Sequence, residues 1–129
     1  MFKMTNREMQ SKVQVLSNIS NKQLPVRVSY AIAKNINAIN KELKIFEDEK
    51  MKIIKEYVIK DEHGNPKIKE NNTYEFIEGK EEECNSKYNE LLDIEVDLKL
   101  RQINVNDLLK SNVNFTPGEL MELDFMLQE

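Results

Sequence analysis

The pattern of hydrophobic and polar positions is most regular between Pro25 and Lys60, a stretch without glycine. Apolar residues recur there at alternating spacings of four and three, which is the heptad pattern of a helix that packs along its length against other helices. The seam runs through Ile32, Ile36, Ile39, Leu43, Phe46, Lys50, Ile53 and Tyr57. A helix of this extent would reach roughly 50 Å. We therefore expect an elongated chain, or one whose seam pairs with a second copy or a partner.

Lys50 is the polar interruption of this seam. A lone polar residue at a core position can fix the register or the oligomeric state of paired helices, at a cost in stability. The alternative is that the helix bends, or that its packing partner ends, at this point. We favour the second interpretation because Met51 and Ile54 shift the apolar stripe sideways just beyond Lys50.

Two further helices are predicted by capping boxes, in which a threonine hydroxyl accepts an amide hydrogen and a glutamate reaches back. Thr5 with Glu8 predicts a helix over about residues 5–20. Thr116 with Glu119 predicts a second helix close to the end of the sequence.

The region between residues 79 and 110 predicts two shorter helices. Acidic residues 81–83 suit the positive end of a helix dipole, so we expect a helix that opens there and runs to about Leu92. A short helical turn is expected around Leu108, with Asn106 as its capping residue.

The strand signals are short. Residues 67–69 and 73–77 have strand propensity and predict a two-stranded flap after a turn at Gly64. Residues 94–101 alternate apolar and polar side chains, which favours a half-buried strand, although a continued helix also fits. The expected fold is α+β and predominantly α. It has a long central helix with flanking helices, as a helical hairpin or bundle, and a small antiparallel sheet or β-hairpin flap. We expect the flap and residues 94–101 to form this sheet together. We expect one domain over residues 1–129.

Composition argues against several classes of protein. Three glycines and three prolines are too few for the many turns of a β-sandwich. There is no Walker glycine loop, no GxSxG elbow and no HExxH motif, so we predict a non-enzymatic protein without cofactor, metal or catalytic residues. No apolar run suits a signal peptide or a membrane span, and the single cysteine excludes an internal disulfide. A reducing cytoplasm is the expected location.

Two single residues could carry chemistry. His63 lies in a turn with no second nitrogen ligand nearby, so we interpret it as solvent-exposed. Cys84 follows three glutamates, whose charge would raise the pKa of a thiol, and it falls on an apolar stripe. We interpret Cys84 as a small core residue.

The net charge of −4 is unevenly distributed. Residues 1–41 carry seven Lys and Arg against one acid, while residues 61–129 carry seven against seventeen. The candidate interaction surface consists of Arg7, Lys12, Lys22, Arg27, Lys34 and Lys41. These cations could lie against the acidic half of the chain or of a second copy, contact a partner protein, or bind a nucleic-acid backbone.

The last predicted helix carries three large apolar side chains, Met121, Phe125 and Met126. Thioether side chains re-pack easily, so these residues could form an adaptable binding surface. At helical spacing the more frequent role of such residues is in the core.

Several segments together resemble small proteins of bacteriophages and prophages of Gram-positive bacteria. They are residues 34–43, Tyr57 with residues 61–66, residues 88–92 and 95–98, and residues 116–120. The resemblance implies a phage context and assigns no site residues.

Three functions are open at this stage. We expect a protein-binding protein, directed at a host or defence factor, that associates as a dimer through Ile32, Ile36, Ile39, Leu43 and Phe46. The first alternative is a nucleic-acid-binding accessory protein that uses the basic N-terminal region. The second is an oligomeric protein that sequesters a small anionic signalling molecule at a subunit interface.

Overall fold

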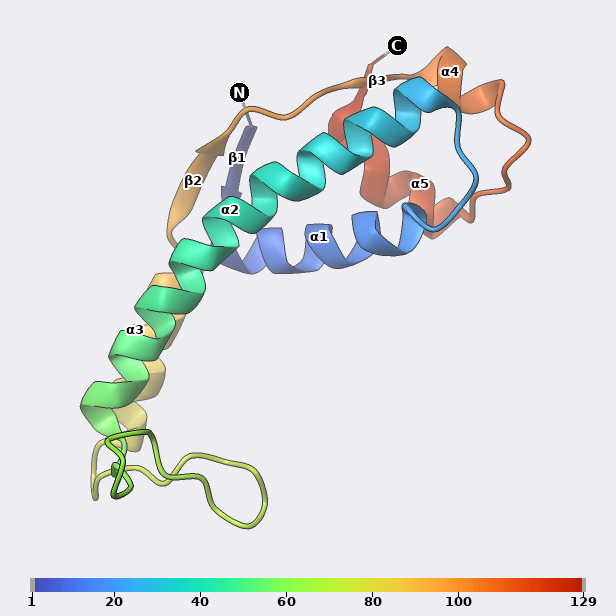
Figure 1. Ribbon diagram of the computed structural model, residues 1–129. Helices are drawn as coiled ribbons and strands as arrows, with labels where there is room; N and C mark the ends of the chain where they lie inside the picture. Colours follow the sequence, from blue (N-terminus) through green and yellow to red (C-terminus); the bar gives the residue numbers. More distant parts are fainter. Residues whose placement is uncertain (1, 129) are drawn as a thin grey trace. The chain divides into compact units, whose positions relative to one another are not determined.

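The structure, a computed structural model, describes residues 2–128 (Figure 1). The chain forms two compact units. The first contains the chain up to Leu43 and from Glu95 onward, and the second is Lys44–Ile94. Helix α2, Val26–Tyr57, contributes its first half to unit 1 and its second half to unit 2. The prediction of an α+β, predominantly α fold with one long helix is confirmed.

Both predicted capping boxes are present. Helix α1, Asn6–Ile19, begins after Thr5, whose hydroxyl accepts the Glu8 N–H at 3.1 Å. Helix α5, Pro117–Leu123, begins after Thr116 in the same way and continues into a 3₁₀ turn, Asp124–Met126. In both boxes the glutamate side chain accepts the N–H of the capping threonine, so two otherwise unpaired donors are satisfied at each helix start.

The small antiparallel sheet has a partner that the sequence analysis missed. Strand β2, Glu95–Leu98, pairs with the N-terminal strand β1, Phe2–Thr5, and not with the flap. Met4 lies opposite Val96, and Met4 and Leu98 are buried. The prediction of a joint sheet of the flap and residues 94–101 was therefore wrong. Strand β1 pairs with β2 instead, because Met4 of β1 and Leu98 of β2 are buried in the same core.

A second, parallel pair joins β3, Ile103–Asn104, to β4, Leu127–Gln128. Helix α4, Val105–Leu109, follows β3 directly. Its capping residue is Asn104, whose side-chain oxygen accepts the Asn106 N–H at 2.8 Å. The prediction of Asn106 as the cap was wrong by two residues.

The core of unit 1 is one cluster of apolar side chains from both ends of the chain. Its buried members are Met4, Met9, Leu16, Ile19, Val28, Ala31, Ile32, Ile39, Leu98, Ile103, Leu108, Leu123 and Met126. Helix α1 contacts α5 within this unit.

The amide side chain of Asn35 is buried beside this core. Asn35 of α2 is 1% exposed, donates to the backbone oxygen of Arg101 at 2.9 Å and accepts the Arg101 N–H at 2.7 Å. The amide thus pairs with both backbone groups of one residue and fixes the extended segment beside α2.

Unit 2 is a helical hairpin. The second half of α2 faces α3, Glu81–Leu92, and the rings of Phe46 and Tyr88 lie 6.1 Å apart. Lys50 places its ammonium group 5.9 Å from the centre of the Tyr88 ring and 3.8 Å from Glu47. The polar residue of the heptad seam therefore lies at the edge of an intrachain packing surface.

The chain between α2 and α3 contains three short extended segments, residues 58–60, 66–68 and 74–76. Each segment pairs with the other two, so the three form a closed ring. Backbone bridges join Val58 to Phe76, Lys60 to Pro66, and Ile68 to Tyr74. The Lys67 N–H donates to Ile59, the Glu75 N–H to Lys67, and the Ile59 N–H to Glu75, at 2.8–3.0 Å. The predicted two-stranded flap thus gains residues 58–60, which had been assigned to the helix, because the β-branched Val58 and Ile59 favour extended backbone. Gly64 and Asn72 adopt positive φ in the connecting turns.

Candidate functional site

Two of the predicted basic residues are neutralised by α5. Lys12 forms an ion pair with Glu122 at 2.8 Å, and its ammonium group lies 5.2 Å from the centre of the Phe125 ring. Lys22 lies 3.5 Å from Glu119 and donates to the backbone oxygen of Asn114 at 3.2 Å. These two cations therefore hold the acidic C-terminal segment within unit 1, which is the intrachain alternative of the sequence analysis.

The remaining cations of the predicted surface lie on two helices, Arg7 on α1 and the other three on α2. Arg7 is exposed on α1, and Lys41 is exposed on α2. Lys34 lies over the ring of Tyr30 at 5.6 Å, and Arg101, which the sequence analysis did not select, lies over the same ring at 5.0 Å. Arg27 lines a groove beside this cluster.

Glu119 makes the stability of α5 depend on pH. The Thr116 backbone N–H, and then the positive charge of Lys22, lower the pKa of Glu119 from its ordinary value of 4.5. A carboxyl with a lowered pKa in the folded state stabilises it above the unfolded pKa, and this contribution is lost as pH falls through the folded value.

We therefore expect Glu119→Gln to reduce stability at neutral pH, and we expect the difference from the wild type to shrink once the pH falls below about 4.5. Urea unfolding at several pH values measures both. Glu90→Gln, at an exposed position on α3, is the control. A difference between Glu119→Gln and wild type that stays constant with pH would contradict the assignment.

The predicted self-association seam lies inside the chain. Ile32 and Ile39 are buried in the core of unit 1, and Ile36 and Leu43 are half-buried against it. Phe46 is buried in unit 2 against Tyr88. Self-association would therefore have to use a different surface.

An exposed apolar surface is formed by α4, α5 and the turn after α5. Met121 is 76% exposed, Leu109 is 74% exposed and Leu120 is 40% exposed. They line a shallow depression of about 500 Å³ together with Val105, Leu108, Asp124 and Leu127. We call this set of seven residues the α4–α5 surface.

The three large apolar residues of the last predicted helix divide between the core and an exposed surface. Met126 is buried in the core, and Phe125 is half-buried with its ring edge-on to Phe2 at 6.2 Å. Met121 alone is fully presented to solvent, on the α4–α5 surface. The sequence analysis did not select Leu109 as a surface residue.

The two candidate chemical residues take the places that the sequence predicted. His63 is exposed, and its backbone N–H donates to Asp61 at 2.9 Å. Cys84 is buried, and burial, assisted by the charge of Glu81, raises the pKa of its thiol. Among residues 2–128 no group of three or more His, Cys, Asp or Glu side chains is placed to hold a metal ion.

None of the helices in the described part of the chain has both the length and the apolar character that a membrane span requires. Comparison with protein-family models, with curated proteins and with solved structures finds no match to the chain.

Proposed function

We propose that the chain is a non-enzymatic binding protein, and that the α4–α5 surface receives an apolar segment of a partner protein. The single observation that carries this proposal is the exposure of Met121 and Leu109 beside each other on one shallow depression. Contiguous apolar patches on a folded chain are typical of interaction sites, whereas single exposed apolar residues are ordinary.

The chemistry of the surface suits a partner of adaptable shape. Methionine has a flexible, polarizable side chain that re-packs around different apolar groups. The depression is open and shallow, as expected for a site that receives the face of a helix rather than a small molecule.

The acidic residues near the α4–α5 surface favour a partner with positive charge. Residues 111–129 contain four acids and no Lys or Arg. Glu119 and Glu122 are paired with Lys22 and Lys12, but Asp124 lies in the depression itself and Asp107 belongs to the adjoining helix α4. The favoured partner therefore carries apolar side chains flanked by Lys or Arg, because complementary charge speeds encounter and selects orientation.

The cellular context of this proposal comes from the sequence resemblance. We place the chain in the cytoplasm of a Gram-positive host as a phage protein that acts on a host or defence factor. The α4–α5 surface is also the one we assign to self-association, since the heptad seam is used inside the chain.

The nucleic-acid alternative is less favoured by the geometry. It relied on Lys12, Lys22, Arg27, Lys34 and Lys41, and the first two are occupied by acids of α5. Proteins that bind a nucleic-acid backbone neutralise several phosphates with cations along one path. Arg27, Lys34 and Lys41 remain on α2, so this alternative has fewer cations than the sequence suggested.

The double variant Leu109→Glu, Met121→Glu tests the protein-binding proposal. We expect it to lose a partner that the wild-type chain captures from a Gram-positive host lysate, with affinity reduced at least about tenfold, because buried anchors dominate interface energy. Quantitative mass spectrometry after affinity capture measures the loss, and light scattering of each variant measures self-association.

Ile45→Glu is the matched control, because Ile45 is 59% exposed and lies on α2 in the other unit. It should retain the partner. Circular dichroism of all three proteins checks the fold. Capture of the same proteins by wild type, double variant and control alike would contradict the proposal, and so would failure of the wild type to capture any protein reproducibly.

A further inference from the structure

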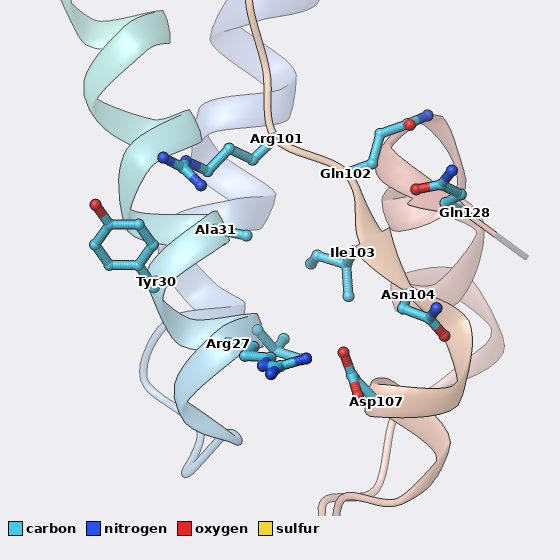
Figure 2. A pocket seen from close by; sticks show the side chains of 10 residues that line it. Arg27, Tyr30, Ala31, Arg101, Gln102, Ile103, Asn104, Asp107 and Gln128 are labelled. Atoms are coloured by element: carbon cyan, nitrogen blue, oxygen red, sulfur yellow. The ribbon is translucent and has the colours of Figure 1, made fainter.

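A polar groove lies in unit 1 between the start of α2 and the extended segment that leads into α4 (Figure 2). Its volume is about 290 Å³, and its base contains the buried apolar residues Val28, Ala31 and Ile103. Its polar walls are formed by Arg27, Tyr30, Arg101, Gln102, Asn104, Asp107 and Gln128. Pockets for small molecules commonly start at about 300 Å³, so the groove suits a compact ligand.

Arg27 is the first cation of the groove. It lies in the first turn of α2, which contains no acidic residue to offset its charge. Figure 2 shows its guanidinium directed across the groove toward Asp107 on α4. Arg27 and Asp107 form no ion pair within residues 2–128, and both line the groove.

Arg101 is the second cation that lines the groove, and Figure 2 shows its guanidinium directed away from Arg27 and Asp107. Its backbone is fixed by Asn35, whereas its exposed side chain extends over the ring of Tyr30, as Figure 2 shows. An exposed contact between a guanidinium and an aromatic face is worth only about 0.5–1 kcal/mol. Charge-assisted hydrogen bonds to a bound anion are stronger, so the exposed Arg101 side chain can leave the ring and rotate toward a ligand in the groove.

Phosphate is the anion that this arrangement fits best. The planar fork of a guanidinium matches phosphate oxygens with two parallel hydrogen bonds. The neighbouring amides of Gln102, Asn104 and Gln128 supply further donors and acceptors for the rest of a small molecule.

We propose that this groove binds a small molecule with a phosphate group, held by Arg27 and Arg101, while Asp107 accepts a hydrogen bond from a hydroxyl or amino group of the same molecule. The site does not depend on the proposed protein-binding surface, because Leu109 and Met121 take no part in it. It needs no subunit interface, since every wall comes from one chain.

Isothermal titration calorimetry with adenosine 5′-monophosphate, inorganic phosphate and adenosine tests the proposal. We expect at least one of the two phosphate probes to bind the wild type, and adenosine to bind much more weakly than its monophosphate. The double variant Arg27→Gln, Arg101→Gln should weaken binding at least about tenfold, since charged hydrogen bonds to the phosphate are lost. Lys41→Gln, which removes one exposed cation elsewhere on α2, should bind as the wild type does.

Asp107→Asn gives a readout with the opposite sign. Removing a negative charge from the wall should strengthen the binding of inorganic phosphate several-fold, because like-charge repulsion is relieved. A general loss of structure would weaken binding instead. The proposal is overturned if neither phosphate probe binds the wild type, if the arginine double variant binds as tightly as the wild type, or if Asp107→Asn leaves phosphate binding unchanged or weaker.

Discussion

Replacing Ile39 by alanine is expected to lower the free energy of unfolding by about 3 kcal/mol, because Ile39 is fully buried and the change leaves a cavity in the core of unit 1. The loss should be the same at low and high protein concentration. Ile39 is a central position of the heptad seam, and in this structure its contacts are intrachain. Urea unfolding of wild type and variant over a wide range of concentration measures both quantities.

The matched control is Ile45→Ala, the same substitution six residues further along the same helix at a 59% exposed position. It should change stability by no more than about 0.5 kcal/mol. An unfolding midpoint that rises with protein concentration in the wild type, and less so in Ile39→Ala, would instead assign the seam to an interface between two chains.

Replacing Asn35 by leucine is the second large change that we expect. Leucine has a similar volume but cannot pair with the N–H and the carbonyl of Arg101, which would then lack partners beside the core. A buried backbone group without a partner costs about 1–3 kcal/mol. Since the Arg101 side chain is exposed and water can reach part of this backbone, we expect a total loss of about 2–4 kcal/mol.

Unfolding in urea measures this loss, and Asn40→Leu is the control. Asn40 is exposed on the same helix, so the same substitution there should be nearly neutral. If Asn35→Leu were as stable as the wild type, the buried amide would have no part in fixing the extended segment. The same variant should also disturb the groove of Figure 2, whose upper wall is the segment that Asn35 holds.

Local signals predicted much of the secondary structure. The capping boxes at Thr5 and Thr116 located two helix starts, because the bonds that make them lie within four residues. The pattern of residues 25–60 predicted one long helix, which ends three residues earlier than expected. These features depend on neighbours in sequence, which is why they can be inferred without the fold.

Long-range pairing could not be inferred in the same way. Strand β2 showed the alternation of a half-buried strand, but nothing in that alternation selects β1 over the flap as its partner. The heptad seam showed that α2 packs against something, but a seam has the same pattern whether its partner is intrachain or a second copy.

The candidate surfaces also depend on contacts between residues that are far apart in the sequence. Met121 had been considered for a binding surface, yet only the packing of α5 separates it from the buried Met126. The sequence did not single out Asn35, because its hydrogen-bond partner, the backbone of Arg101, lies 66 residues away. Arg101 and Asp107 lie far from Arg27 in sequence, so the groove exists only in the fold.

The ring of three extended segments in unit 2 differs from an ordinary hairpin in its edges and in how it opens. An ordinary hairpin leaves two rows of unpaired backbone groups that another chain can extend. Here each segment pairs with both others, so no outer edge is presented at the ring positions. Release of one segment breaks its bonds to both neighbours, and the region therefore opens in a single cooperative step. The turns at Gly64 and Asn72 lie outside the ring, so variation in loop length can accumulate there while the closed pairing is kept.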